Sequence, residues 1–239
     1  TTKANDCNMW SVEKNIKNLI IDCNVQSYVK YLSLYNFGHL EGLKVSGYIY
    51  KVEGLEKLIN LRSLNIPSLV MGVDSLNSHQ KLESYRGELT IRDDEKERLN
   101  LRSYRGCITS RIFYSIILNR HFNPDRLEEL EVDCSFGRKI FTLNTFVNLK
   151  RLTIWTGLGS PAELSTLVDL EELNITFEGE FNCAVLCGMT RLTKLTVKCS
   201  TFFNGEQLSD RILEGLTELS INGLSHESIT NRLPIMTKL

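Results

Sequence analysis

Apolar residues recur along this chain in a six-residue pattern, Leu-x-x-Leu-x-apolar. Within each copy the fourth and sixth residues are apolar and the third and fifth are mostly polar, which is the alternation of a strand with one buried face. Successive copies begin 19 to 26 residues apart, so the pattern predicts one short strand per repeat. Clear copies begin at Ile16, Leu40, Leu61, Leu127, Leu149, Leu170, Leu192 and Leu216, and degenerate copies begin at Leu82 and Leu101.

Strands this short can neither pair their backbone groups nor bury their apolar face alone. Stacking similar repeats in register supplies both, which predicts a parallel sheet along a solenoid. Between strands, apolar residues three and four apart, such as Leu164 and Leu167, predict short helical or 3₁₀ returns. One return also begins with the pattern of a capping box, Ser160-Pro161-Ala162-Glu163.

The repeat resembles that of the leucine-rich-repeat family, Leu-x-x-Leu-x-Leu-x-x-Asn/Cys-x-Leu over about 20 to 29 residues. The resemblance covers roughly residues 16–239. It implies an α/β solenoid curved like a horseshoe, with a parallel β-sheet on the concave face and short helical or 3₁₀ returns on the convex face. It also implies protein binding across the concave face. At the family's Asn/Cys position only Asn24 fits, so the usual side-chain ladder in the turn is expected to be largely absent.

The chain is predicted to comprise an N-terminal cap segment, residues 1–15, and a solenoid of about 10 to 11 units, residues 16–239. Met9, Trp10 and Val12 are expected to cover the first strand. The sequence stops at Thr237-Lys238-Leu239, midway through a repeat motif. Because an end repeat exposes its apolar edge unless it is capped, either the chain is truncated here, or a partner or a second copy in a dimer or larger assembly covers this end.

The centre of the solenoid, near residues 82–126, is irregular. In the two degenerate copies Tyr85 and Tyr104 take the inward fourth position, and Gly87 and Gly106 take the inward sixth. This pairing predicts that each ring fills the space that a glycine leaves. Residues 111–120 are predicted to form a helix that stops before the Asn-Pro pair at 123–124.

Composition and charge narrow the class of partner. The chain has 36 Leu but only 3 Ala, which argues against stacked helix pairs. The chain has 28 Lys and Arg and 29 Asp and Glu, a net charge of -1. No global electric field therefore favours binding of nucleic acid or a membrane surface. No apolar stretch approaches the roughly 20 residues of a membrane-spanning helix. Seven Cys, an odd number, favour reduced thiols and a cytoplasmic or nuclear location, with secretion as the alternative.

Residues that could support catalysis form no motif. The four His lie in different connections, and the sequence has no Gly-rich phosphate loop or nucleophile elbow. Cys183 and Cys187 have no second ligand pair nearby, and Cys199 is interpreted as a small core thiol. The sequence therefore predicts no catalytic residue, no metal and no cofactor.

The predicted partner-binding surface is the concave face, where the third, fifth and seventh residues of each copy point outward. The sign of charge changes from repeat to repeat. Opposite charges on neighbouring strands either support one another across the sheet or form stripes complementary to a partner. Trp155 is either an exposed aromatic anchor or a ring folded back over the turn. The predicted partner-binding residues are Arg62, Arg86, Arg102, Arg105, Glu129, Glu131, Arg151, Trp155, Glu172 and Lys194.

The function predicted is that of a non-catalytic protein–protein interaction scaffold or recognition module with a protein partner. One alternative is the substrate-recognition part of a ubiquitin-ligase receptor of the F-box type, although the helical adaptor-binding box is not evident in residues 1–15. Another is a regulator of a small GTPase or phosphatase, in which Arg62, Arg102 or Arg105 would act on the other enzyme's site.

Overall fold

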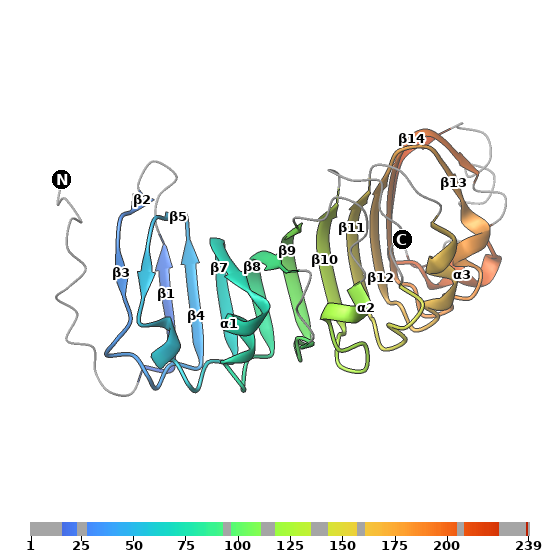
Figure 1. The fold of residues 1–239 in the computed structure, drawn as a ribbon. Helices are drawn as coiled ribbons and strands as arrows, with labels where there is room; N and C mark the ends of the chain where they lie inside the picture. Colours follow the sequence, from blue (N-terminus) through green and yellow to red (C-terminus); the bar gives the residue numbers. More distant parts are fainter. Residues whose placement is uncertain are drawn as a thin grey trace. The chain divides into compact units, whose positions relative to one another are not determined.

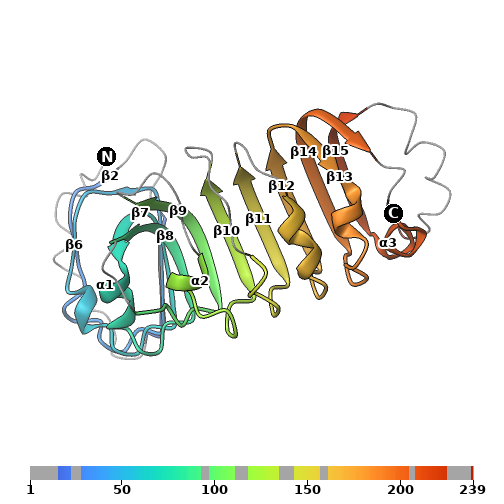
Figure 2. The same ribbon diagram turned by 45° about the vertical axis from the view of Figure 1, so that its right-hand side comes forward.

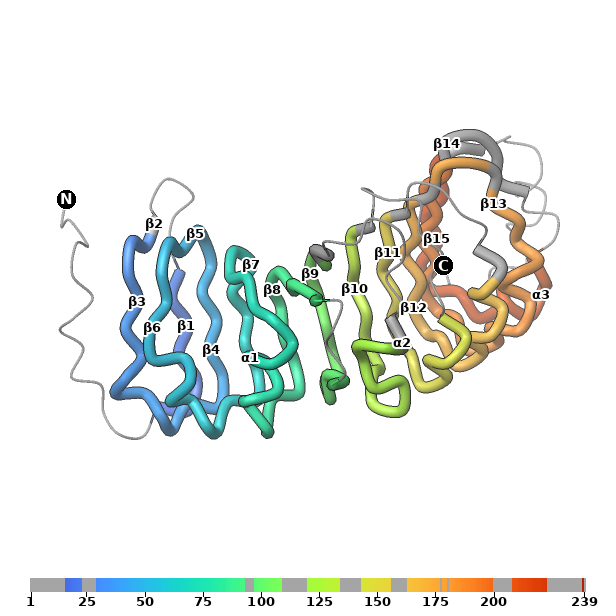
Figure 3. Tube along the Cα trace, viewed as in Figure 1, coloured from blue at the N-terminus to red at the C-terminus, as the bar shows by residue number. Residues whose placement is uncertain are grey.

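The chain forms two compact units, Thr1–Thr109 and Ser110–Leu239 (Figure 1). A computed structural model describes residues 16–22, 28–92, 97–110, 118–134, 143–156, 161–204, 208–224 and 238. In each unit, successive repeats follow one another as coils of the Cα trace (Figure 3). Each coil contributes one strand to a parallel sheet and then a return segment.

Five strands form the parallel sheet of the first unit, in the order β1-β4-β7-β8-β9. Asn18 pairs with Gly42, and Gly42 pairs with Ser63, so equivalent residues of successive repeats lie side by side. This register is the one that the repeat predicts. The strands are β1 Asn18–Asp22, β4 Gly42–Ser46, β7 Ser63–Gly72, β8 Ser84–Ile91 and β9 Ser103–Ser110.

Each of the first two returns of the first unit contains two short strands, and the prediction of a helical or 3₁₀ return is wrong for the described part of the first. These are extended: β2, Tyr28–Val29, pairs with β5, Tyr48–Ile49, and β3, Leu32–Ser33, pairs with β6, Val52–Glu53 (Figure 2). Buried Ile49 lies between two exposed tyrosines, and this two-residue alternation favours a strand. The second return continues into the 3₁₀ helix η2, Leu55–Lys57, as predicted, and the third contains the helix α1, Val73–Asn77.

The second unit continues the same plan. Leu130 pairs with Leu152, Leu152 with Leu173, and Leu173 with Leu195 in parallel register. Its strands are β10 Glu129–Cys134, β11 Arg151–Thr156, β12 Glu172–Phe177, β14 Lys194–Asn204 and β15 Glu218–Leu224, with β13 Glu180–Asn182 beside the far half of β14. Its returns hold α2 Leu118–His121, η3 Pro161–Thr166, η4 Cys183–Leu186 and α3 Asp210–Gly215.

Columns of inward side chains build the core of each unit. Leu40, Leu61, Leu149 and Leu170, which open four of the repeats, are all 0% exposed. Burying a leucine fully contributes about 1.5–3 kcal/mol, so the leucines at most first and fourth positions dominate the stability of the coils that carry them. Parallel strands at the repeat spacing, inward leucines and short returns make each unit an α/β leucine-rich-repeat solenoid, as predicted.

Tyrosine and glycine replace the usual aliphatic pair in β8 and β9. Tyr85 and Tyr104 are 0% exposed, with ring centroids 6.0 Å apart. A Cβ atom on Gly87 would collide with the hydroxyl oxygen of Tyr85, and one on Gly106 would lie 3.2 Å from that of Tyr104. The prediction that the rings fill the space beside the glycines is confirmed.

The hydroxyl groups of these tyrosines also serve the backbone. The Oη atom of Tyr85 lies 2.8 Å from the carbonyl oxygen of Leu69 and 3.0 Å from that of Glu88, so it can donate to either. These carbonyls flank a register shift between β7 and β8, after Asn65 and before Val70. Tyr85 therefore supplies a donor where the regular ladder is interrupted.

Several predicted features fall on residues that the structure does not describe. These are the cap residues Met9, Trp10 and Val12, the turn residue Asn24, Ser160 of the capping box, residues 111–117 of the predicted central helix, and the last repeat motif. Of that helix, α2 is the described end, and it stops before Asn123. No helix in the described part of the chain is long and apolar enough to cross a membrane.

Candidate functional site

Each sheet has one face toward its core and one outward face. In the second unit Leu152 and Ile154 are buried, while Arg151 and Trp155 on the same strand reach solvent. Because equivalent residues pair in register, the outward side chains form lines across the strands, which we name the third-, fifth- and seventh-position rows. The fifth-position row comprises Ile20, Lys44, Asn65, Arg86 and Arg105 in the first unit, and Glu131, Thr153, Asn174, Thr196 and Ser220 in the second.

The third-position row of the second unit alternates in charge: Glu129, Arg151, Glu172, Lys194 and Glu218 lie on neighbouring strands. Arg151 forms an ion pair with Glu129, and the Lys194 Nζ atom lies 2.9 Å from the Glu218 carboxylate. The hydrogen bond to Glu218, together with the negative charges of Glu218 and Glu172, raises the pKa of Lys194. These are the cross-strand pairs that the alternating signs predict.

Two of the predicted binding residues lie outside the outward rows. Arg62 and Arg102 occupy the second position of their repeats, one residue before β7 and β9 begin. The Arg62 guanidinium lies 2.8 Å from the Glu83 carboxylate, which is the second-position residue of the next repeat. Second-position residues therefore form a separate line of charge pairs at the entrance to the sheet, repeated by Lys150 with Glu128 at 3.3 Å.

Trp155 lies in the seventh-position row of the second unit, between Asp133 on β10 and Thr176 on β12. Its side chain is half-buried, so part of the ring is open to solvent on the outward face. It is thus placed to contact a molecule that also contacts the fifth-position row of the same unit.

Polar groups of the fifth-position row are largely unused by the chain. In the described part of the structure, Thr153, Asn174 and Thr196 make no side-chain hydrogen bond, and Lys44 and Arg86 make no ion pair. Arg105 and Glu131 do have partners. The sequence prediction favoured charged residues and so omitted Lys44 and the threonines. Their fifth place in the repeat is the signal that identifies them.

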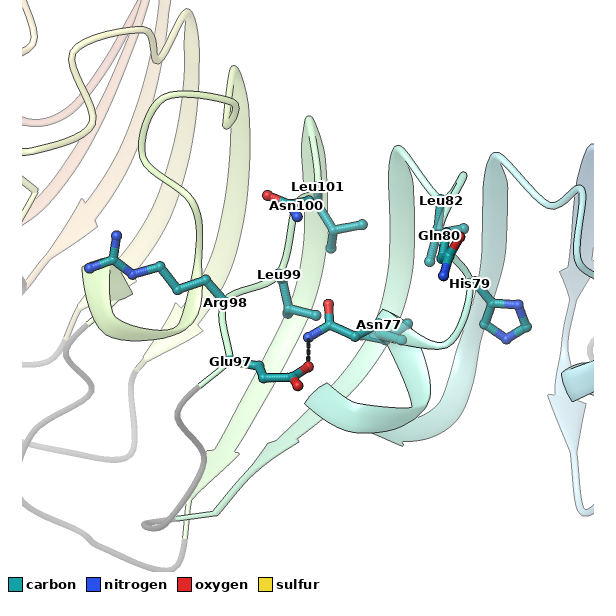
Figure 4. A pocket seen from close by; sticks show the side chains of 10 residues that line it. Asn77, His79, Gln80, Leu82, Glu97, Arg98, Leu99, Asn100 and Leu101 are labelled. Atoms are coloured by element: carbon teal, nitrogen blue, oxygen red, sulfur yellow. Dashed lines mark hydrogen bonds between the residues drawn. The ribbon is translucent and has the colours of Figure 1, made fainter.

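The returns of the first unit carry a pocket of about 390 Å³ (Figure 4). Asn77 donates to the Glu97 carboxylate across its wall at 3.0 Å. The ring of His79 points away from Glu97 and Arg98, so these titratable groups do not converge. The described residues of the pocket wall therefore present no acid–base pair aimed at a common point.

Two cysteines and two histidines of the described residues, Cys183, Cys199, His79 and His121, are buried. Burial raises the pKa of the Cys183 thiol to about 12. The Cys199 thiol donates to the Asn222 carbonyl oxygen at 3.4 Å, as fits a small core thiol. No group of three or more His, Cys, Asp or Glu side chains within the described ranges is arranged to hold a metal ion.

Comparison with known proteins finds distant structural likenesses. No protein-family model matches the chain, and no curated protein matches it. It is similar to the solved structure of a plant peptide hormone receptor, RGFR1, in complex with RGF2, at 16% identity and a TM-score of 0.43 over 88% of this chain. It is also similar to PEPR1 in the PEPR1–AtPEP1 structure, at 14% identity and a TM-score of 0.26 over 95% of this chain.

This chain spans 41% and 48% of the lengths of those two chains. Likenesses this distant indicate nothing about activity or partner. The leucine-rich-repeat architecture follows instead from the parallel register and the inward leucines of each unit.

Proposed function

We propose that this protein is a non-catalytic recognition module of the leucine-rich-repeat family, which binds an extended segment of a protein partner across the outward face of its sheet. The observation that supports the proposal is the fifth-position row. It presents hydrogen-bonding groups in register on neighbouring strands, and the described part of the chain uses almost none of them.

The second unit offers the most suitable stretch of this row. Thr153, Asn174 and Thr196 are half-buried, so their hydroxyl and amide groups sit at a shallow, partly desolvated surface. A peptide backbone crossing them has donors and acceptors of its own, which short polar side chains can satisfy from either direction. Trp155 lies beside this stretch and can supply the aromatic contact that often dominates a binding surface.

Charges on the same face favour recognition over catalysis. Arg151 and Lys194 are held by carboxylates on neighbouring strands, an arrangement that keeps a polar sheet soluble and orders its side chains. A peptide lying beside them would meet a fixed pattern of alternating charge, which contributes to specificity more than to affinity.

Selection from a displayed library of random peptides tests the proposal. The full chain is immobilised, and selected peptides are measured against two double variants, Thr153→Arg/Thr196→Arg on the outward face and Thr166→Arg/Thr190→Arg on the returns. Both pairs replace exposed or half-exposed threonines by the same residue. We expect selected peptides to bind the first variant at least tenfold more weakly and the second as tightly as the parent.

Trp155 provides a direct readout. In a Trp10→Phe background it is the single tryptophan, and its emission should shift when a peptide covers the face. Failure to select any peptide, or equal loss in both double variants, would overturn the proposal.

A further inference from the structure

The outward faces of the two units differ in how their charges are balanced. In the second unit, cations of the third-position row are paired with Glu129 and Glu218. In the first unit, the third-position row is small and uncharged, with Gly42, Ser63 and Ser84 in register. Its cations lie instead in the fifth-position row, and no carboxylate from the described residues pairs with Lys44 or Arg86.

We propose that Lys44 and Arg86 form a binding site for acidic peptide segments on the outward face of the first unit. The inference rests on the proposed function and names the chemistry of the partner. Both side chains are exposed, and Asn65 lies between them in register on β7. Two such cations without an ion pair gain from an anionic partner, which is the charge complementarity that steers and selects peptides.

The small third-position row allows such a peptide to approach. Ser63 and Ser84 carry short hydroxyl groups that make no side-chain hydrogen bond in the described structure, whereas the side chain of Asn18 lies over Gly42. A peptide backbone can therefore lie close to the sheet over β7 and β8, beside Arg86. The hydroxyl groups can donate to its carbonyl or carboxylate oxygens.

Strand spacing sets the spacing of the acidic residues. Lys44 and Arg86 stand two strands apart, about 10 Å at the usual 4.8 Å between strands. A peptide in the polyproline II conformation advances about 3.1 Å per residue and completes a turn in three residues, so side chains three residues apart lie on one side and span about 9 Å. The matching motif has two acidic residues separated by two others.

A nucleic acid fits this face less well than an acidic peptide. Single strands rely on aromatic side chains on which bases stack, and duplexes require many phosphate contacts. The outward rows of the first unit contain no aromatic residue, and only two of their cations lack an ion pair among the described residues.

Fluorescence anisotropy with labelled twelve-residue peptides tests the inference on the full chain. One peptide carries Glu at every third position, and two matched peptides carry Gln or Lys there. A dT12 oligonucleotide is the nucleic-acid arm. We expect the Glu peptide to bind at least tenfold more tightly than the Gln peptide and the oligonucleotide, and to weaken as salt is added.

Charge reversal at the site provides the decisive comparison. Lys44→Glu/Arg86→Glu should reduce binding of the Glu peptide at least tenfold and create binding of the Lys peptide. The matched control, Lys30→Glu/Lys57→Glu, changes net charge equally at two exposed lysines of the returns and should leave binding of the Glu peptide nearly unchanged. Unfolding midpoints establish that each variant folds. If the charge-reversal variant does not fold, the charge-neutral variant Lys44→Gln/Arg86→Gln takes its place and should also weaken binding of the Glu peptide.

Three results would overturn the inference: equal binding of the Glu and Gln peptides, equal loss in both double variants, or tighter binding of the oligonucleotide. Suppose that display selects peptides whose binding depends on Thr153 and Thr196, while binding of the Glu peptide does not depend on Lys44 and Arg86. The inference about acidic peptides then fails and the proposed function stands. If neither experiment finds a peptide that depends on an outward face, both fail.

Discussion

The hydroxyl oxygen of Tyr85 lies where a side chain on Gly87 would begin. The same added Cβ atom would stand 2.8 Å from the Leu69 carbonyl oxygen, so neither a ring nor a backbone group can yield space easily. Tyr104 and Gly106 repeat the arrangement in the next strand. Each tyrosine therefore depends on the glycine two residues later.

Exchanging either member of this pair should destabilise the first unit. We expect Gly87→Ala to lower the free energy of unfolding by about 1–3 kcal/mol through overpacking. Tyr85→Phe should lower it by about 1–2 kcal/mol, because buried carbonyl groups lose their donor. Urea unfolding measures both, with Tyr50→Phe, at a side chain 77% exposed, as the unchanged control.

Restoring the usual aliphatic pair should recover part of the loss. The double variant Tyr85→Leu/Gly87→Val fills the inward positions as in other repeats. Its loss of unfolding free energy should therefore be smaller than the sum of the losses in the single variants Tyr85→Leu and Gly87→Val. Strict additivity would show that the two positions are independent and would contradict the steric account.

Reversing one charge of the third-position row should produce a salt-dependent loss. Arg151→Glu would set three carboxylates side by side, since Glu129 and Glu172 flank it in register. Because the row is exposed, the loss should stay below about 1 kcal/mol in low salt and shrink as NaCl is added. Lys198→Glu, between Thr176 and Asn222, is the matched control. Equal losses in the two variants would count against ordered pairing.

Stability of the chain should fall as pH drops below about 6.5, the ordinary pKa of histidine. Burial lowers the pKa of His79 and of His121 in the folded protein. Below pH 6.5 the unfolded chain therefore takes up protons that the folded chain does not, and the free energy of unfolding decreases until the folded pKa is reached. Above pH 7.5 both histidines are neutral in the folded and in the unfolded chain, so they no longer make the free energy of unfolding depend on pH.

Variants at His79 separate this effect from other titrations. His79 occupies the return position that Leu58 and Phe146 hold in other repeats, where the backbone carbonyl accepts from the leucine three residues on. His79→Leu should flatten the profile of unfolding midpoint between pH 7.5 and 5.5, and His121→Leu should flatten it further. An unchanged slope in the double variant would assign the dependence to other groups.

Thiol reactivity should separate surface cysteines from core cysteines. Cys187 is exposed and should react with a thiol reagent in the folded protein, whereas Cys183 is buried and its pKa is raised to about 12. Because the thiolate is the reactive form, Cys183 should react only after unfolding. Cys187→Ser should remove one fast thiol, and Cys183→Ser none.

The number of free thiols measured in denaturant tests the expected cellular location. Seven thiols would support the expected cytoplasmic or nuclear site, and a single thiol would indicate three disulfides and contradict it.

Much of the fold follows from sequence because leucine spacing is a strong and redundant signal. The inward places of Leu130 and Leu152, and their pairing, were predictable since a slip of one residue would expose every apolar side chain of a strand. Inward Tyr85 beside Gly87 was predictable for the same reason.

Other features depend on choices that spacing leaves open. Arg151 has a carboxylate on each side, and its pairing with Glu129 rather than Glu172 is a matter of side-chain geometry. The extended segments β2 and β5 were missed because the helical spacing of other returns, such as that of Leu164 and Leu167, was generalised to every return. His79 reads as a polar loop residue in the sequence and takes a core place only through the turn that it shares with other repeats.

Alternating charge in the third-position row of the second unit also constrains how such a chain can change its length. Losing the single repeat that carries Arg151 would set Glu129 beside Glu172, two like charges on adjacent strands. Losing that repeat together with the next would set Glu129 beside Lys194 and keep the signs opposed. Insertions follow the same parity, so recombination can lengthen or shorten this sheet without electrostatic cost only in steps of two repeats.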